Sequence, residues 1–322
     1  MICPAGGMLA GYFRKEERKM MKKFVLFAMI AAAMTAGCSS GDSGENFADS
    51  LEIPCVTLND GRKMPVLGLG TWTQDNDTAE ESVYTAIREG YRLIDTARYY
   101  GNESGVGKGV RRAIAEGLVK REDIFITTKI MPGNYANPDS AVDDSNRALG
   151  LGYIDLMLIH QPGYNDEGVY KALERGVKSG KIRSIGISNY YTPSEFERIT
   201  RNAEIMPAVV QNENHIYFQN TELQRYLQRY GTIVESWYPF GGRGHIGRVL
   251  ADDTVRRIAA SHGKTPAQVI LRWHIQAGYV VIPGSKNPAH IKENVSIFGF
   301  VLTDEEMNAM ASVDRQERFE SW

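Results

Sequence analysis

The sequence is poor in cysteine and has no marked excess of either charge. Its three cysteines, Cys3, Cys38 and Cys55, all lie near the N-terminus. They provide no disulfide framework and no CxxC metal site, so no metal is expected. A formal net charge of -2 removes the electrostatic reason to expect a nucleic-acid partner. The length of 322 residues and the hydrophobic content of 43% describe an ordinary globular protein of one large or two medium domains.

The N-terminal apolar run is too short to span a bilayer. It covers residues 24–37 and follows Lys22 and Lys23, a pattern that is typical of a secretory signal. Its ending, Thr35-Ala36-Gly37-Cys38, resembles a bacterial lipoprotein signal. That resemblance implies a lipid on Cys38 and a place in the cell envelope, with the cytoplasm as the alternative. A core or amphipathic helix competes with this interpretation, but the run lacks the alternation of polar residues that such a helix shows.

The chain divides into three segments by composition. Residues 1–37 form an N-terminal extension with the signal, and the small, polar residues 38–50 suit a flexible tether. Residues 51–322 form the folded domain. Contact with a membrane is expected only through a lipid on Cys38, and we expect a monomer.

The folded domain alternates between strand-like and helix-like stretches. It opens with a hairpin at residues 55–65, whose turn is Asn59-Asp60-Gly61. Strands are then predicted at residues 66–70, 92–96, 124–129, 154–160, 182–188, 208–211, 232–237 and 279–283. Helices are predicted at residues 78–89, 106–116, 138–149, 193–201, 222–230 and 266–276, with a last one after the capping box at residues 303–306.

Eight strand–helix alternations of this size predict a (β/α)8 TIM barrel with the hairpin closing its bottom. A doubly wound open sheet is the alternative. That fold normally carries GxGxxG after its first strand, whereas the stretch here is Gly68-Leu69-Gly70-Thr71-Trp72-Thr73. Because the third glycine is missing, the barrel is favoured.

Three polar residues follow successive predicted strands, and a tyrosine lies just beyond the first of them. Asp95, Lys129 and His160 end the second, third and fourth strands, and Tyr100 comes five residues after Asp95. In a barrel the carboxyl ends of all strands meet at one rim. Taken singly, each residue has a structural explanation, such as a loop cap, a solvated lysine or a packed ring. Their joint placement predicts a site.

This combination suits proton transfer to a developing alkoxide. Tyrosine is a weak acid with a pKa of about 10, and a nearby lysine such as Lys129 lowers that pKa by stabilising the phenolate. Asp95 would position Lys129. His160 can donate a hydrogen bond to a carbonyl oxygen. Carbonyl reduction needs such a set of groups.

Several motifs resemble those of the aldo-keto reductases, especially bacterial members similar to 2,5-diketogluconate and general aldehyde reductases. The resemblance covers residues 51–318 and is carried by residues 64–72, by Asp95-Thr96-Ala97-x-x-Tyr100-x-Asn102-Glu103, and by residues 156–162 and 180–190. It implies that Tyr100 is the general acid and base, that Lys129 and Asp95 tune it, and that His160 orients the carbonyl. It also implies a nicotinamide cofactor as the hydride donor.

The resemblance assigns further residues to the cofactor. Those expected to contact the nicotinamide are Ser188, Asn189, Gln211 and Trp237. In the phosphate and adenine motif the family has a lysine and an arginine where this chain has Gly284 and His290. The remaining expected contacts there are Ser285, Lys286, His290, Glu293 and Asn294. The loss of those two cations is expected to weaken a contact to a 2′-phosphate, because charge-assisted bonds are the strong ones, and Lys286 is the residue that would compensate. NADP(H) is preferred on the strength of the retained donors, with NAD(H) as the alternative.

The resemblance also places Trp72 and Gln161 in the substrate pocket. Gln161 stands where many relatives have a tryptophan, and the loop at residues 163–168 is short and polar. A small carbonyl substrate in an open, hydrophilic pocket is therefore expected, and sugar-like carbonyls would fit it.

Two other functions compete with a carbonyl reductase. One is a nicotinamide-binding barrel without turnover, acting as a redox sensor or partner subunit. The other is a non-redox lyase or hydrolase, but no paired acids or metal-ligand cluster stand out. Export also conflicts with cofactor supply, because an exported protein would have to obtain its dinucleotide outside the cytoplasm.

Overall fold

A computed structural model of the chain describes residues 53–321. The predicted signal, the tether and the predicted lipidation site Cys38 lie outside these residues. Within the described part, no helix is long and apolar enough to cross a membrane.

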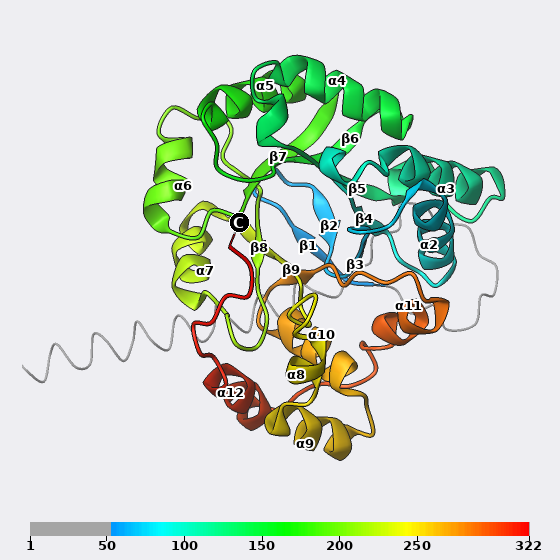
Figure 1. Ribbon diagram of the computed structural model, residues 1–322, viewed down its shortest axis with the longest axis vertical. Coiled ribbons are helices and arrows are strands. Elements are labelled where there is room, and N and C mark those ends of the chain that lie inside the picture. The colour runs from blue at the N-terminus through cyan, green and yellow to red at the C-terminus, as the bar shows by residue number, and fades with distance from the viewer. Residues whose placement is uncertain (1–52, 322) are drawn as a thin grey trace, which may run out of the picture. The chain divides into compact units, whose positions relative to one another are not determined.

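The core of the fold is a barrel of eight parallel strands, as the sequence predicts (Figure 1). Neighbouring strands pair in chain order, and parallel bridges from Leu67 to Val281 and from Gly70 to Gly284 connect the last strand to the first. The strands are β3 (Gly68–Gly70), β4 (Leu93–Asp95), β5 (Phe125–Ile130), β6 (Ile154–Ile159), β7 (Ile182–Ser188), β8 (Val209–Glu213), β9 (Ile233–Trp237) and β10 (Val280–Val281).

Helices surround the barrel, and most of them bury a face against it (Figure 1). The helices at residues 246–250, 253–262 and 304–312 instead bury apolar residues in a second cluster with the helix at residues 266–276. Three of them begin with a capping box, at Thr192, Thr265 and Thr303. The helices are α2 (Asn76–Arg88), α3 (Glu103–Ala115), α4 (Pro138–Leu149), α5 (Asp166–Lys178), α6 (Pro193–Thr200), α7 (Thr221–Leu227), α8 (Ile246–Leu250), α9 (Asp253–His262), α10 (Pro266–Gln276), α11 (Pro288–Val295) and α12 (Asp304–Ser312).

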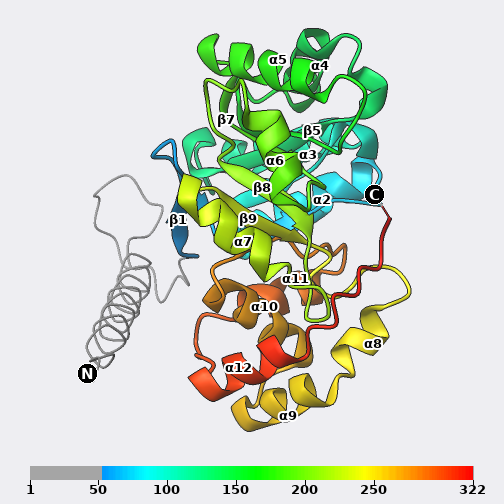
Figure 2. The ribbon, with the colours of Figure 1, turned by 90° about the vertical axis from the view of Figure 1, so that its left-hand side faces the viewer.

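The hairpin of β1 (Cys55–Thr57) and β2 (Lys63–Pro65) closes the bottom of the barrel, as predicted. Asn59 Nδ2 donates to the carbonyl oxygen of Pro207, just before β8, over 2.9 Å. Ser184 Oγ, near the start of β7, donates to Asp60 Oδ2 over 2.6 Å. Met64 packs into the apolar cluster inside the barrel. The segment that follows α12 ends at the opposite end of the barrel from the hairpin (Figure 2).

Element boundaries differ from the predictions for local reasons. Helix α2 begins at Asn76 rather than Thr78, because the Asp75 side chain caps it by accepting from the backbone N–H of Thr78 over 2.8 Å. Strand β10 has two residues, since Pro283 has no N–H to donate. No range was predicted for α5, α8, α9 or α11. Helix α11 buries only Ile291, Asn294 and Val295, which leaves a weak helical pattern.

Candidate active site

The strand ends bring the four predicted catalytic residues together. Asp95 is the last residue of β4 and Lys129 lies one residue before the end of β5, while His160 directly follows β6. Tyr100 ends a short 3₁₀ helix that follows β4. All four therefore lie at the carboxyl rim, opposite the hairpin, where (β/α)8 enzymes carry their sites.

Lys129 is the centre of this group. Its Nζ lies 2.6 and 2.8 Å from the two carboxylate oxygens of Asp95 and donates to the Thr96 carbonyl oxygen over 2.9 Å. It also donates to Tyr100 Oη over 3.2 Å. The Lys129 side chain is 0% exposed, and a buried ammonium needs such partners. Asp95 and Tyr100 therefore both lie within hydrogen-bonding distance of the Lys129 ammonium.

The electrostatics keep Lys129 charged and Tyr100 protonated. Burial lowers the pKa of Lys129, but the Asp95 carboxylate raises it, and the net direction is upward. Burial raises the pKa of Tyr100 to about 12, although Lys129 acts to lower it. The expected lowering by lysine is present, but desolvation outweighs it. Tyr100 therefore holds its proton at neutral pH, as a proton donor must.

His160 is neutral and lies beside Tyr100. Their ring centroids are 5.7 Å apart. Burial, followed by repulsion from Lys129, lowers the pKa of His160 well below its usual value. Its Nδ1 has no partner among the described residues, and Asn189 Nδ2 donates to its backbone oxygen over 2.9 Å. A neutral imidazole held in this way can donate one hydrogen bond to a carbonyl oxygen.

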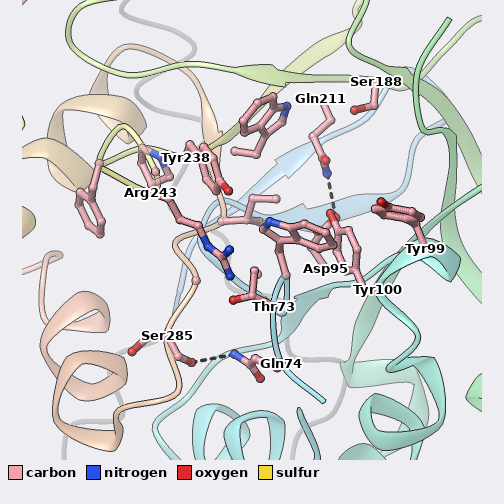
Figure 3. Close-up of a pocket in the computed structure, with 18 of the residues that line it drawn as sticks. Thr73, Gln74, Asp95, Tyr99, Tyr100, Ser188, Gln211, Tyr238, Arg243 and Ser285 are labelled. Carbon is pink, nitrogen blue, oxygen red and sulfur yellow. Dashed lines mark hydrogen bonds between the residues drawn. The ribbon is translucent and has the colours of Figure 1, made fainter. Parts of the chain in front are cut away.

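A pocket opens above these residues (Figure 3). It includes three of the four catalytic candidates, Asp95, Tyr100 and His160, while Lys129 lies beneath it. The other predicted residues in its lining are Trp72, Ser188, Asn189, Gln211, Trp237, Ser285 and Lys286.

Besides Lys129, four predicted residues of the described part are not in this lining: Gln161, His290, Glu293 and Asn294. The backbone oxygen of Gln161 accepts from Tyr135 Oη over 2.5 Å. Glu293 Oε1 accepts from Thr265 Oγ1 over 2.6 Å, and Asn294 is buried in α11. His290 is exposed in the first turn of α11. These four residues lie outside the lining of this pocket, and their assignment to the cofactor or substrate stays a prediction.

The pocket wall beside Tyr100 is aromatic rather than hydrophilic. Trp72 stacks on Tyr99 with ring centroids 5.7 Å apart and an interplanar angle of 18°. Its ring also lies 4.8 Å from that of Tyr100. Trp237 and Phe240 line the pocket as well. The expectation of a hydrophilic pocket depended on Gln161, whose side chain the lining does not include.

The residues expected to hold a nicotinamide fit such a ring. Ser188 Oγ is buried in the lining and has no partner among the described residues, so it is free to bond a carboxamide. Trp237 offers an aromatic face in the same lining. Gln211 Nε2 donates to Asp95 Oδ2 over 2.8 Å and to Glu235 Oε2 over 2.7 Å. Its carbonyl oxygen is therefore the amide atom left for a ligand.

Two residues were missed from the sequence. Arg243 lies in the glycine-rich loop after β9 and points into the pocket toward Thr73 (Figure 3). A cation in a flexible loop directly after a barrel strand could have suggested it. Glu235, inside β9, is 0% exposed. An acid within a buried apolar strand was the available signal for it.

Three lining residues have a left-handed backbone. Thr73, Asn189 and Tyr238 have φ values of 70°, 66° and 53°, and all three line the pocket. This conformation is uncommon for residues other than glycine and costs about 1–3 kcal/mol each. Such strain gathers at functional sites because surrounding contacts hold it in place. The strained backbone therefore supports this pocket as a functional site. Among the described residues, no cluster of side chains could hold a metal ion.

Comparisons with known proteins agree with this geometry. The model of the Aldo/keto reductase family matches residues 66–315. The chain is 38% identical over 307 residues to the NAD(P)H-dependent D-xylose reductase I,II of Candida tropicalis, covering 83% of this chain and 94% of that one. It is 39% identical over 270 residues to methylglyoxal reductase DkgA of Yersinia pestis, covering 82% and 94%.

A solved structure gives the same result. The Bombyx mori aldo-keto reductase AKR2E4, in complex with NADP, matches with a TM-score of 0.78 and 33% identity, covering 83% of this chain and 95% of that one. Fold, family model and sequence relatives agree over nearly the whole described domain. The chain therefore belongs to the aldo/keto reductase family, and NAD(P)H-dependent reductases are among its relatives.

Proposed function

We propose that this protein reduces small aldehydes and ketones to alcohols, with Tyr100 as the proton donor and NADPH as the preferred hydride source. One observation carries the proposal. Tyr100 Oη lies 3.2 Å from Lys129 Nζ, which is itself paired with Asp95, and this group borders a pocket shared with His160. Neither a non-catalytic nicotinamide-binding barrel nor a non-redox lyase or hydrolase would use all four residues.

Each of the four residues has a separate role in the proposed reaction. A carbonyl oxygen placed between Tyr100 and His160 accepts a hydrogen bond from each. Tyr100 gives its proton to that oxygen as negative charge develops, and the Lys129 ammonium stabilises the phenolate that remains. Asp95 keeps Lys129 in place. A reduced nicotinamide bound near Ser188, Gln211 and Trp237 would supply the hydride to the carbonyl carbon.

The pocket favours small carbonyl compounds with a flat or CH-rich face. Its aromatic wall, formed by Trp72, Tyr99 and Trp237, can pack against such a face. Relatives are named for D-xylose and methylglyoxal, which are small carbonyl compounds. We therefore include both compounds in the proposed substrate range.

The direct test is oxidation of NADPH by the purified protein with a panel of aldehydes. The panel should hold xylose, methylglyoxal, an aliphatic aldehyde and an aromatic aldehyde. Aldehyde-dependent oxidation supports the proposal. Tight NADPH binding without any turnover across the panel would instead favour the non-catalytic nicotinamide-binding barrel.

Lys286 is expected to set the preference for NADPH over NADH. It lines the pocket beside Ser285, and charge-assisted bonds to phosphate are the strong ones. Lys286→Ala should weaken NADPH binding about tenfold, the effect of losing one charged hydrogen bond. NADH binding should hardly change. Dissociation constants for both cofactors, from quenching of tryptophan fluorescence, check this.

The matched control for this variant is Lys292→Ala. Lys292 is an exposed lysine of α11 outside the pocket lining, so its loss should leave both constants unchanged. If Lys286→Ala weakened the binding of NADPH and of NADH equally, Lys286 would not be the residue that binds the 2′-phosphate.

The proposed location is the cell envelope, with a lipid on Cys38. The support is the signal-like sequence at residues 22–38. Fractionation of cells should find the wild-type protein with membranes, and Cys38→Ala should move it to the soluble fraction. Soluble cytoplasmic protein in both cases would contradict a lipid anchor and leave the cytoplasmic alternative.

A further inference from the structure

Glu235 is a buried acid with no ion-pair partner within hydrogen-bonding distance among the described residues. It is 0% exposed. Ile233 and Trp237, two positions away on either side, pack against the apolar cluster inside the barrel. Because strand side chains alternate, Glu235 also points into the barrel, one layer below the pocket. A buried acid in such a place is costly unless it is neutral or has a task.

The direct hydrogen-bond partner of Glu235 is Gln211. Gln211 Nε2 donates to Glu235 Oε2 over 2.7 Å and to Asp95 Oδ2 over 2.8 Å. An amide nitrogen has two hydrogens, and both are used in this way. Figure 3 shows the Gln211 amide directed at Asp95 from across the pocket floor. Because both acids accept from the amide nitrogen of Gln211, they hold this nitrogen toward the barrel interior.

The charges around Glu235 favour its neutral form. Lys129, on β5 across the barrel, is the cation that acts on Glu235, and Asp95 already neutralises it. Glu235 Oε1 has no partner among the described residues, which a carboxylate would tolerate poorly. Burial, followed by repulsion from Asp95, raises the pKa of Glu235 to about 8, against weaker lowering by Gln211 and Lys129. At neutral pH the acid therefore stays mostly protonated.

We propose that Glu235 is a positioning residue for the cofactor: it holds the Gln211 nitrogen toward the two acids, so that the Gln211 carbonyl oxygen faces the pocket and accepts from a nicotinamide carboxamide. This inference rests on the proposed function. Without Glu235 the Gln211 amide keeps one acceptor, Asp95, and is free to turn. In the wild-type protein, ionisation of Glu235 also changes the charge beneath the site proposed for the nicotinamide ring.

Two substitutions separate the acceptor from the charge. Glu235→Gln keeps an acceptor oxygen for Gln211 but cannot ionise, whereas Glu235→Met has similar length and no acceptor. Glu235→Met should weaken both NADP⁺ and NADPH binding on the order of tenfold, the effect of one misplaced hydrogen bond. Glu235→Gln should bind both within about twofold of wild type at pH 7, since the orienting bond is retained.

The pH dependence gives a second readout. Ionisation of Glu235 above a pH of about 8 places negative charge beneath the ring site, near Asp95, Lys129, Tyr100 and neutral His160. Oxidised nicotinamide is positively charged and reduced nicotinamide is neutral. The affinity ratio of NADP⁺ to NADPH should therefore rise through that pH in wild type and stay flat in Glu235→Gln.

The experiment measures both dissociation constants by fluorescence quenching from pH 6 to pH 9.5, with thermal melting for each variant. Glu174→Gln is the matched control, because Glu174 is a buried acid that accepts from the backbone of Glu204 and Ile205 outside the pocket lining. It should change the melting temperature without moving either constant.

Three results would overturn the inference: unchanged affinities in Glu235→Met, equal losses in the Gln and Met variants, or a pH-dependent ratio that persists in Glu235→Gln. The pH-dependent ratio in Glu235→Gln remains measurable if Glu235→Met does not fold. The proposed function fails separately, if the wild-type protein neither binds NADPH nor oxidises it with an aldehyde.

Discussion

Replacing Tyr100 with phenylalanine should lower kcat for aldehyde reduction by about 10²- to 10⁴-fold, the range that one positioned proton donor contributes. The phenyl ring keeps the contact with Trp72, whose centroid lies 4.8 Å from that of Tyr100. It removes the hydroxyl that lies 3.2 Å from Lys129 Nζ. The fold should therefore survive while proton donation is lost.

Steady-state kinetics with NADPH and one good aldehyde measure this effect, and NADPH binding should be nearly unchanged. Tyr99→Phe is the matched control. Tyr99 is adjacent to Tyr100, lines the same pocket and is 53% exposed. Among the described residues, its hydroxyl has no hydrogen bond to Lys129. If both variants lost the same modest activity, Tyr100 would be a packing residue and not the acid.

The catalytic group was predictable because its signals are local in the sequence. Asp95 ends an apolar run, and so do Lys129 and His160. Parallel barrel strands carry their ends to one rim whatever the helices between them do. The fold class followed from the same alternation, and the hairpin from its Asn59-Asp60-Gly61 turn.

What could not be predicted depends on contacts between distant segments. The two bonds of Gln211 reach strands β4 and β9, and no local pattern shows which end of an amide faces them. The pKa of Tyr100 reflects the balance of burial against Lys129, and burial is unknown until the barrel closes. Arg243 reaches the pocket through a loop, whose course the sequence does not determine.

The prediction of a hydrophilic pocket depends on a single substituted position, Gln161. Gln161 lies one residue after His160, but its side chain is absent from the pocket lining, and its backbone oxygen is tied to Tyr135. The wall beside Tyr100 is instead built by Trp72 and Tyr99 stacked on each other. One residue type does not define a pocket when neighbouring aromatic rings can cover the same wall.

The charge balance below the pocket makes Lys129 the residue whose loss should harm stability most. Lys129→Met leaves the buried carboxylate of Asp95, which is 2% exposed, without its cation. Removing one partner of a buried pair typically costs about 3–5 kcal/mol. We expect that loss in the free energy of unfolding, together with a fall in kcat of about 10²-fold or more, because Tyr100 loses the charge that stabilises its phenolate.

Asp95→Asn should destabilise the protein less than Lys129→Met. Lys129 would keep the carbonyl oxygen of Thr96 at 2.9 Å and the hydroxyl of Tyr100 at 3.2 Å. Glu235 would also lose the repulsion from Asp95 that helps to raise its pKa, so it could ionise and serve as the counterion. Both single variants should lose activity, but only Lys129→Met should leave a buried carboxylate, that of Asp95, without a cation.

The double variant Asp95→Asn/Lys129→Met completes this argument. It removes one acid together with the cation and leaves Glu235 neutral, so it should be more stable than Lys129→Met alone. Urea unfolding of the four proteins at pH 7 gives the coupling energy directly. Additive losses would mean that the 2.6 Å pair contributes no coupling. A double variant less stable than either single one would show that the buried site needs its charges to keep its packing.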